Sequence, residues 1–413
     1  MHAKTGAESN TSAELIRHPS GPAVAAAILL LPLSCQIVAS NAPVGISFLP
    51  YFLLILAAIN IRRRARIRGN LAYLAGWLLA PIMLLAMVAS RSTAGLLLTV
   101  SAFGGAVTVL VTSDWEKSQV ERFVALPLLI ASSFQAFVVI LQTVTDRAVV
   151  LNWFVPDAAL REIDGLLRAQ GTMTHVYEPP ALGLLAAGVA IATRPRSQRT
   201  QLIWVVGVLL AGMSVGLTHS RAAVLGLLLM APFVAWGAKQ RDGHLLRMGS
   251  ALFVGFALAS AFTASAWLHR VDHSTSGSLD DVALGRITLA KQAVEIATDN
   301  PILGVGPGRY LTVLETQYDV DENYPYRVHN VSLALAVETG IAAAIVLSII
   351  VGTAVVRASR SGPAGGALAM SILGFALFDV LHYDRPVGIL MFGIWLAVLQ
   401  HHQSTTSRLV KSA

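Results

Sequence analysis

Apolar stretches recur along the whole chain and are separated by shorter polar segments. A helix of ~20 apolar residues crosses the ~30 Å hydrocarbon core of a bilayer. The pattern therefore predicts an all-α polytopic membrane protein with about twelve transmembrane helices. The sixth and the last two stretches are short or interrupted. The predicted spans are 22–40, 43–61, 71–89, 92–113, 123–145, 178–193, 201–218, 222–238, 248–268, 330–355, 364–381 and 386–402.

The composition agrees with this pattern and excludes a soluble globular protein. Of the 413 residues, 55% are hydrophobic and 13% are charged, and the mean hydropathy is +0.64. Values this apolar are typical of chains that spend most of their length in a membrane. The single cysteine, Cys35, falls in the first span, which excludes an intramolecular disulfide and a thiolate metal cluster.

Lys and Arg gather in alternate loops, which predicts the orientation of the chain. The basic loops are 62–68 ("RRRARIR"), 114–122, 194–200, 239–247 and 357–362. Because cytoplasmic loops are enriched in Lys and Arg, we expect these loops and both termini to be cytoplasmic. The asymmetry also explains the net charge of +7, so we expect no nucleic-acid partner.

The domain organisation follows from the same pattern. Residues 1–21 are polar and are expected to form a disordered cytoplasmic tail, 22–402 a single multi-span membrane domain, and 403–413 a second cytoplasmic tail. The segment 22–40 also has the features of a signal peptide, but we favour an uncleaved first span. Two long loops, 146–177 and 269–329, are predicted to face outward, the second between the ninth and tenth spans.

Polar residues collect at the predicted outer ends of five separate segments. Each one alone is compatible with an ordinary interfacial side chain. As a set, they favour a shared extracytoplasmic site. The segments are "THVYEPP" with His175 and Glu178, "THSRAAVL" with His219 and Arg221, "GRITLAKQ" with Arg286 and Lys291, "RVHN" with Arg327, His329 and Asn330, and "DVLHYDRP" with Asp379, His382, Asp384 and Arg385.

The stretch "NPILGVGPGRY" (300–310) places Gly304, Gly306 and Gly308 at alternate positions. It lacks the Gly-Lys-Ser/Thr ending of a P-loop, so it is either a plain turn or a place where backbone approaches a phosphate. On the outer side, that phosphate would be lipid-linked. Glu338 lies within the tenth span, where a carboxylate is costly unless it has a partner. Both a structural and a substrate-binding role are open for it.

One histidine pair has a spacing found in metal sites. "HRVDH" places His269 and His273 four residues apart with Asp272 between them, a spacing that could bind a divalent metal on a helix. The segment continues into "STSGS", so a solvated linker is favoured, and we expect no metal and no cofactor.

The region 285–343 resembles the signature region of the bacterial O-antigen ligase and O-antigen polymerase superfamily. The resemblance rests on "GRITLAKQAVEIATDNPILGVGPGRY" followed by "HNVSLALAVETGIAA". Upstream, "RAQGTMTHVYEPPALG" is similar to the family's Arg-x-x-Gly-Thr stretch, and Arg221 and Leu225 fit an Arg-x-x-x-Leu motif. His329, Asn330 and Gly340 fit the ligase motif, but Ala343 departs from it.

The resemblance implies a GT-C-like enzyme of the bacterial inner membrane with its active site in the periplasm. Such an enzyme moves a glycan from undecaprenyl diphosphate to a hydroxyl of the lipid A core. It also implies inversion at the anomeric carbon without a metal. Arg221 and Arg286 would neutralise the diphosphate, and His329 would be the catalytic base. The expected substrate-binding residues are His175, Gly304, Gly306, Gly308, Arg327, Asn330, Glu338 and Arg385.

Two alternatives stay open. A polymerase of the same superfamily would use the end of a lipid-linked repeat unit as acceptor, and it shares the signature region. A membrane transporter or lipid flippase is a different class, for which internal repeats and polar residues near the membrane midplane are typical.

Overall fold

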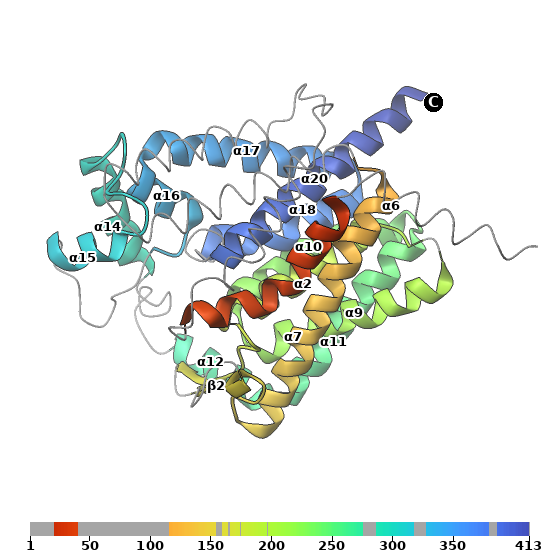
Figure 1. Ribbon diagram of the computed structural model, residues 1–413, viewed down its shortest axis with the longest axis horizontal. Coiled ribbons are helices and arrows are strands. Elements are labelled where there is room, and N and C mark those ends of the chain that lie inside the picture. The colour runs from red at the N-terminus through yellow and green to blue at the C-terminus, as the bar shows by residue number, and fades with distance from the viewer. Residues whose placement is uncertain are drawn as a thin grey trace, which may run out of the picture.

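The computed structural model describes residues 20–39, 115–153, 159–163, 166–173, 175–195, 197–275, 286–317, 328–379 and 386–412. The predicted spans 43–61, 71–89 and 92–113 lie outside the described residues. Within the described part, the chain is almost entirely helical (Figure 1).

The longest helices form one bundle. Lys117–Val120 (α6), a π-helical turn at Glu121–Ala125 and Leu126–Thr145 (α7) run on as one segment. Short connections join successive helices from α8 to α11, and within this set α9 packs mainly against α8 and α11. The other bundle helices are α2 (Ser20–Ala39), α8 (Glu178–Ala192), α9 (Gln198–Leu217), α10 (Arg221–Lys239), α11 (Gly243–Phe262), α17 (Ile341–Arg360), α18 (Pro363–Phe378) and α20 (Pro386–Ser412).

Five helical segments in the described residues are long and apolar enough to cross a membrane. They are Lys117–Thr145, Gln198–Leu217, Arg221–Lys239, Gly243–Phe262 and Ile341–Arg360. Large apolar side chains remain exposed on them, such as Leu202 and Ile203 on α9 and Leu258 and Phe262 on α11. An apolar outer surface of this kind suits contact with lipid. The predicted polytopic class is therefore supported, while four further predicted spans correspond to shorter apolar helices.

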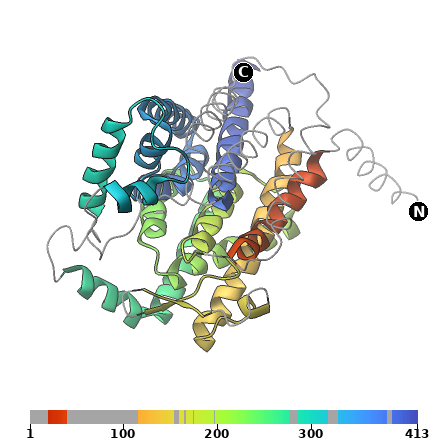
Figure 2. The same cartoon turned by 60° about the vertical axis from the view of Figure 1, so that its left-hand side comes forward.

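The short helix α8 lies at the centre of the bundle. All of its residues, Glu178 to Ala192, are buried, and it packs against α7, α9 and α18. Figures 1 and 2 show the other helices placed around it, with α2 lying along α7. Because other helices cover it on all sides, α8 does not need the length of a helix that faces lipid.

The two predicted outer loops contain regular structure. The first holds a short hairpin of β1 (Arg161–Ile163) and β2 (Leu166–Arg168) after a 3-10 turn at Leu151–Trp153. The second contains α14 (Arg286–Asp299) and α15 (Tyr310–Gln317). The "HRVDH" segment, predicted to be a linker, instead lies in α12 (Ala264–Thr275).

The predicted tenth span, 330–355, is broken into α16 (Val331–Thr339) and α17 at Gly340. The glycine turn, residues 301–308, packs against this break. Its N–H groups at Val305 and Gly306 donate to the carbonyls of Val337 and Glu338, over 2.8 and 3.0 Å. In return, the N–H of Ile341 donates to the carbonyl of Pro301 over 2.9 Å.

The Glu338 side chain completes this arrangement, which we call the glycine clamp: the glycine turn, Glu338 and Gly340. One carboxylate oxygen accepts from the N–H of Gly308 over 2.7 Å, and the other accepts from the N–H of Tyr310 over 3.3 Å. Tyr310 is the first residue of α15, so the carboxylate also meets the positive end of a helix dipole. This geometry favours the structural role for Glu338.

Glycine is required on both sides of the clamp. Gly304 has φ +64° and Gly340 has φ +96°, values that strain other residues. A Cβ at Gly340 would lie 2.1 Å from the carbonyl oxygen of Ile302, and one at Gly304 would lie 2.4 Å from that of Val337. The two backbones therefore touch directly.

The bundle geometry makes the orientation testable. In a Cys35→Ser background, Thr145→Cys, at the end of α7, should react with a membrane-impermeant maleimide in intact spheroplasts. Arg199→Cys, at the start of α9, should react only after permeabilisation, because its loop is basic and expected to be cytoplasmic. Both positions are exposed. The reverse labelling pattern would contradict the predicted orientation.

The clamp predicts that Gly340→Ala lowers the free energy of unfolding by at least about 1–3 kcal/mol, the usual cost of a strained backbone position. The measurement is thermal unfolding of the purified protein in detergent. The matched control is Gly352→Ala in α17, where an added Cβ meets nothing within 4 Å. Equal melting temperatures for the two variants would disprove the steric role of Gly340.

Candidate functional site

The segment from Arg168 to Thr172, in the first predicted outer loop, is fixed to the bundle by two amide side chains of α7. The Gln142 side chain accepts from the N–H groups of Gln170 and Gly171 and donates to the carbonyl of Gly171 over 2.8 Å. Gln135 pairs with Thr172 through both backbone and side chain. All these residues are buried, so this part of the loop belongs to the core.

Arg168 connects this segment to the bend between α9 and α10. Its guanidinium is fully buried and donates twice to the carbonyl of Thr218, over 3.1 and 2.6 Å. It also lies 5.3 Å from the ring centre of Tyr177, at the distance of a cation–π contact. A charged group removed from water needs such partners, so the bend at Thr218 is held firmly in place.

The bend itself sets the position of Arg221. His219 adopts φ +52° and is buried, with its ring edge-on to Trp267 at 5.1 Å. Ser220 caps the next helix by accepting from the N–H of Ala223 over 3.3 Å. Arg221 is therefore the first residue of α10, at the helix N-terminus.

Arg286 begins α14 in the same region. Burial lowers the pKa of its guanidinium, Asp379 and Tyr177 raise it, and the nearby positive charge of Arg221 lowers it. Arg286 thus lies within electrostatic range of three residues from three other segments. We call Tyr177, Arg221, Arg286 and Asp379 the arginine corner.

Asn330 joins the start of α16 to this corner. Its side-chain oxygen accepts from the N–H of Leu333 over 3.0 Å, which caps α16. Its amide group donates to the carbonyl of Leu377 over 3.1 Å. Leu377 is two residues before Asp379, and His329 directly precedes Asn330. The hydrogen bond therefore holds the half-buried His329 next to the segment that carries Asp379.

Four helices present their N-termini here: α8, α10, α14 and α16. A helix N-terminus carries a partial positive charge, which adds to the charges of Arg221 and Arg286. Two buried carboxylates, Glu178 and Asp379, offset part of this charge. Glu178 accepts from the N–H of His175 over 3.0 Å, and the His175 ring lies 4.7 Å from that of Tyr177. The arrangement suits an anion. The described residues contain no cluster of three metal-ligating side chains.

The structure thus brings together His175, Arg221, Arg286, His329 and Asn330 from four of the five predicted segments. Asp379 represents the fifth, because Arg385 lies outside the described residues, as does Arg327. Gly304, Gly306, Gly308 and Glu338 lie in the clamp at the other end of α16, about 12 Å along the helix axis from Asn330. A direct role of these four residues in substrate binding stays a prediction.

Sequence reasoning missed several residues that build the site. Arg168 and Tyr177 lie inside motifs of the sequence but have no predicted role, and Asp379 belongs to the polar set at the fifth segment without a role of its own. Gln135 and Gln142 are amides within an apolar span, where a polar side chain needs a partner. This need for a partner marks Gln135 and Gln142 as structural residues in the sequence, although neither side chain is charged.

Comparison with known proteins gives one family match. Residues 206–348 match the family described as O-antigen ligase, and a search of curated proteins gives no match. The matched part runs from α9 into α17 and includes both arginines of the corner and the whole glycine clamp. The region that carries Arg221, Arg286 and His329 is therefore similar to the O-antigen ligase family, which confirms the predicted resemblance to the O-antigen ligase and polymerase superfamily.

Proposed function

We propose that the protein is an O-antigen ligase-type glycosyltransferase of the bacterial inner membrane. In this proposal, it moves a glycan from undecaprenyl diphosphate to a sugar hydroxyl of the lipid A core at the periplasmic face. The match to the O-antigen ligase family supports the reaction type. The donor, the acceptor and the orientation belong to the proposal.

The observation that carries it is the pair of like charges in the arginine corner. Arg221 and Arg286 come from different helices, are both half-buried and lie within electrostatic range of each other. Holding two cations together partly away from water is costly, and Asp379 supplies one negative charge against two positive ones, so a further anion would stabilise the pair. A diphosphate suits this place, because each guanidinium can bind two of its oxygens.

The proposed chemistry is a direct displacement. The acceptor hydroxyl oxygen bonds to the anomeric carbon as the bond from that carbon to the diphosphate oxygen breaks. The leaving electron pair stays on the diphosphate, where Arg221 and Arg286 stabilise the charge. His329 takes the hydroxyl proton on an imidazole nitrogen. Attack from the side opposite the leaving group inverts the anomeric centre.

The other residues would serve the same step by binding or positioning. Asn330 caps α16 and so orients His329. His175 lies beside Tyr177 at the edge of the corner and is proposed to contact the glycan. Arg327 and Arg385 are further candidates for the phosphates.

A deletion strain tests the function as a whole. Loss of all glycan-capped lipid A, with long lipid-linked polymer still made, supports a ligase. A single repeat unit still attached to lipid A supports a polymerase of the same superfamily. Absence of polymer from the periplasmic face, with normal synthesis inside, points to transport.

The anion role predicts the effect of changing either arginine. Arg221→Ala and Arg286→Ala should each abolish glycan transfer by purified protein, and Lys at either position should restore little, because an ammonium cannot bind two phosphate oxygens as a planar fork does. Lys291→Ala, an exposed change on the same helix as Arg286, is the matched control and should keep full activity. Full activity of both Lys variants would contradict the bidentate role.

The base role predicts that His329→Ala lowers turnover by about two to four orders of magnitude, the usual contribution of a positioned base. Binding of the lipid-linked donor should persist, because the arginines remain. Turnover per folded molecule and donor affinity are measured on the same preparation. A variant with poor yield but near-normal turnover would assign His329 a purely structural role.

A further inference from the structure

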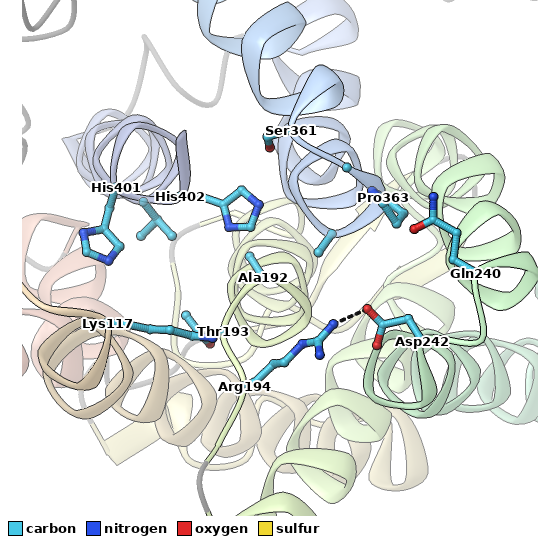
Figure 3. Close-up of a pocket in the computed structure, with 13 residues that line it drawn as sticks. Lys117, Ala192, Thr193, Arg194, Gln240, Asp242, Ser361, Pro363, His401 and His402 are labelled. Carbon is cyan, nitrogen blue, oxygen red and sulfur yellow. Dashed lines mark hydrogen bonds and ion pairs between the residues drawn. The ribbon is translucent and has the colours of Figure 1, made fainter. Parts of the chain in front are cut away.

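A pocket lies at the end of the bundle opposite the arginine corner. Its volume is ≈ 320 Å³, at the lower end of the ~300–1,000 Å³ range of small-molecule sites. It forms where α8 and α10 end and where α6, α11 and α18 begin (Figure 3). The lining residues are Lys117, Ala192, Thr193, Arg194, Gln240, Asp242, Ser361, Gly362, Pro363, Ala364, Val398, His401 and His402.

The side chains at its mouth and base differ in exposure. Lys117 and Gln240 are exposed, and the Arg194 side chain is 56% exposed. His401 is 8% exposed and lies deeper, as do Ala192 and Thr193. Figure 3 shows Lys117, Arg194 and His402 directed toward the space between the helices. The pocket is therefore open to the surface and has a buried, partly polar floor.

The charge of the lining is positive. Asp242 is the one acid among the described lining residues, and both of its carboxylate oxygens are engaged. One oxygen caps α11 by accepting from the N–H groups of His244 and Leu245, each over 3.2 Å. The other forms an ion pair with Arg194. The lining thus combines the basic side chains of Lys117 and Arg194 with two imidazoles, those of His401 and His402.

The N-terminus of α18 adds to this charge. The helix begins at Pro363 after Gly362, and no side chain caps it. The first N–H groups of a helix have no acceptor within the helix and carry partial positive charge. The His402 ring lies against this first turn, because a Cβ at Gly365 would be 2.9 Å from its Cδ2. The N-terminus of α18, the His402 ring and the side chains of Lys117 and Arg194 therefore all line the same pocket.

We propose that this pocket binds an organic phosphate, as a second anion site separate from the arginine corner. Basic residues at the cytoplasmic ends of helices are common for reasons of topology alone. Here they line a pocket together with the N-terminus of α18, which no side chain caps, and this combination suits a phosphate oxyanion. Two sources share this chemistry: the headgroup of an anionic phospholipid and a soluble phosphate ester.

The test compares two double variants of the full-length protein in detergent. Lys117→Gln/Arg194→Gln removes two positive charges from the pocket. Lys239→Gln/Arg360→Gln removes two exposed charges at the same end of the bundle, from residues that do not line the pocket. Native mass spectrometry measures binding of phosphatidylglycerol against phosphatidylcholine. Thermal shift measures binding of glycerol phosphate and inorganic phosphate.

The pocket pair should weaken binding by about tenfold or more, since a hydrogen bond to a charged group contributes about one decade in affinity or more. The control pair should bind as the wild type does. Loss of phosphatidylglycerol binding in the pocket pair alone identifies a lipid source, and loss of glycerol phosphate binding identifies a soluble one. Binding of no phosphate probe, or equal loss in both pairs, overturns the proposal.

A folding control keeps the result decisive. Both pairs should be monodisperse and melt within a few degrees of the wild type in the absence of ligand. If the pocket pair does not fold, Lys117→Gln alone is compared with Lys239→Gln, because both side chains are exposed. No glycan substrate is needed, so the outcome does not depend on the proposed transfer reaction.

Discussion

The carboxylate of Glu338 is the contact on which the arrangement of α14, α15 and α16 depends. It accepts from Gly308 and Tyr310 and so joins the glycine turn to the break between α16 and α17. The turn follows directly after α14. The C-terminal ends of α14 and α16 are therefore held together, and the two helices point their first residues, which carry Arg286 and Asn330, toward the same region. A single buried acid thus positions groups at the other end of α16.

A second set of contacts works in the same way on the other side of the corner. Arg168 is fully buried and donates two hydrogen bonds to one backbone carbonyl, that of Thr218. The carbonyl belongs to the bend that starts α10, so the position of Arg221 depends on Arg168, which also lies against the Tyr177 ring of the corner. Both arginines of the proposed site are therefore placed by buried polar contacts, and small shifts in these contacts would move charge relative to substrate.

Much of the bundle could be predicted, because an uninterrupted apolar run has few ways to satisfy its backbone other than a helix. The bounds of α7, α9 and α10 follow from this. The break at Gly340 could not be predicted in the same way, since 330–355 is apolar throughout apart from Glu338 and its polar neighbours. It exists because the backbone of the glycine turn approaches within van der Waals distance, a contact between segments far apart in sequence.

The candidate site was predictable to a similar degree. Helix ends that share one side of a membrane meet, so grouping His175, Arg221, Arg286 and Asn330 required only the topology. The residues that position these side chains were not predictable, because the contacts join distant parts of the sequence. Arg168, for example, donates to the carbonyl of Thr218, 50 residues away. Asp379 was visible only as one of several polar residues after α18. Such pairings depend on packing that no local pattern records.

The shortness of α8 has a consequence for the membrane itself. Its fifteen residues extend about 22 Å, less than the ~30 Å thickness of the hydrocarbon core. In the predicted topology, in which α8 is a span, irregular chain makes up the remaining depth at one end of the helix or at both, including Tyr177 before it and Thr193 after it. Such chain is tolerated at that depth only when protein or water surrounds it. The polar groups would then sit in recesses below the headgroup level, where a lipid phosphate could reach them without leaving its leaflet.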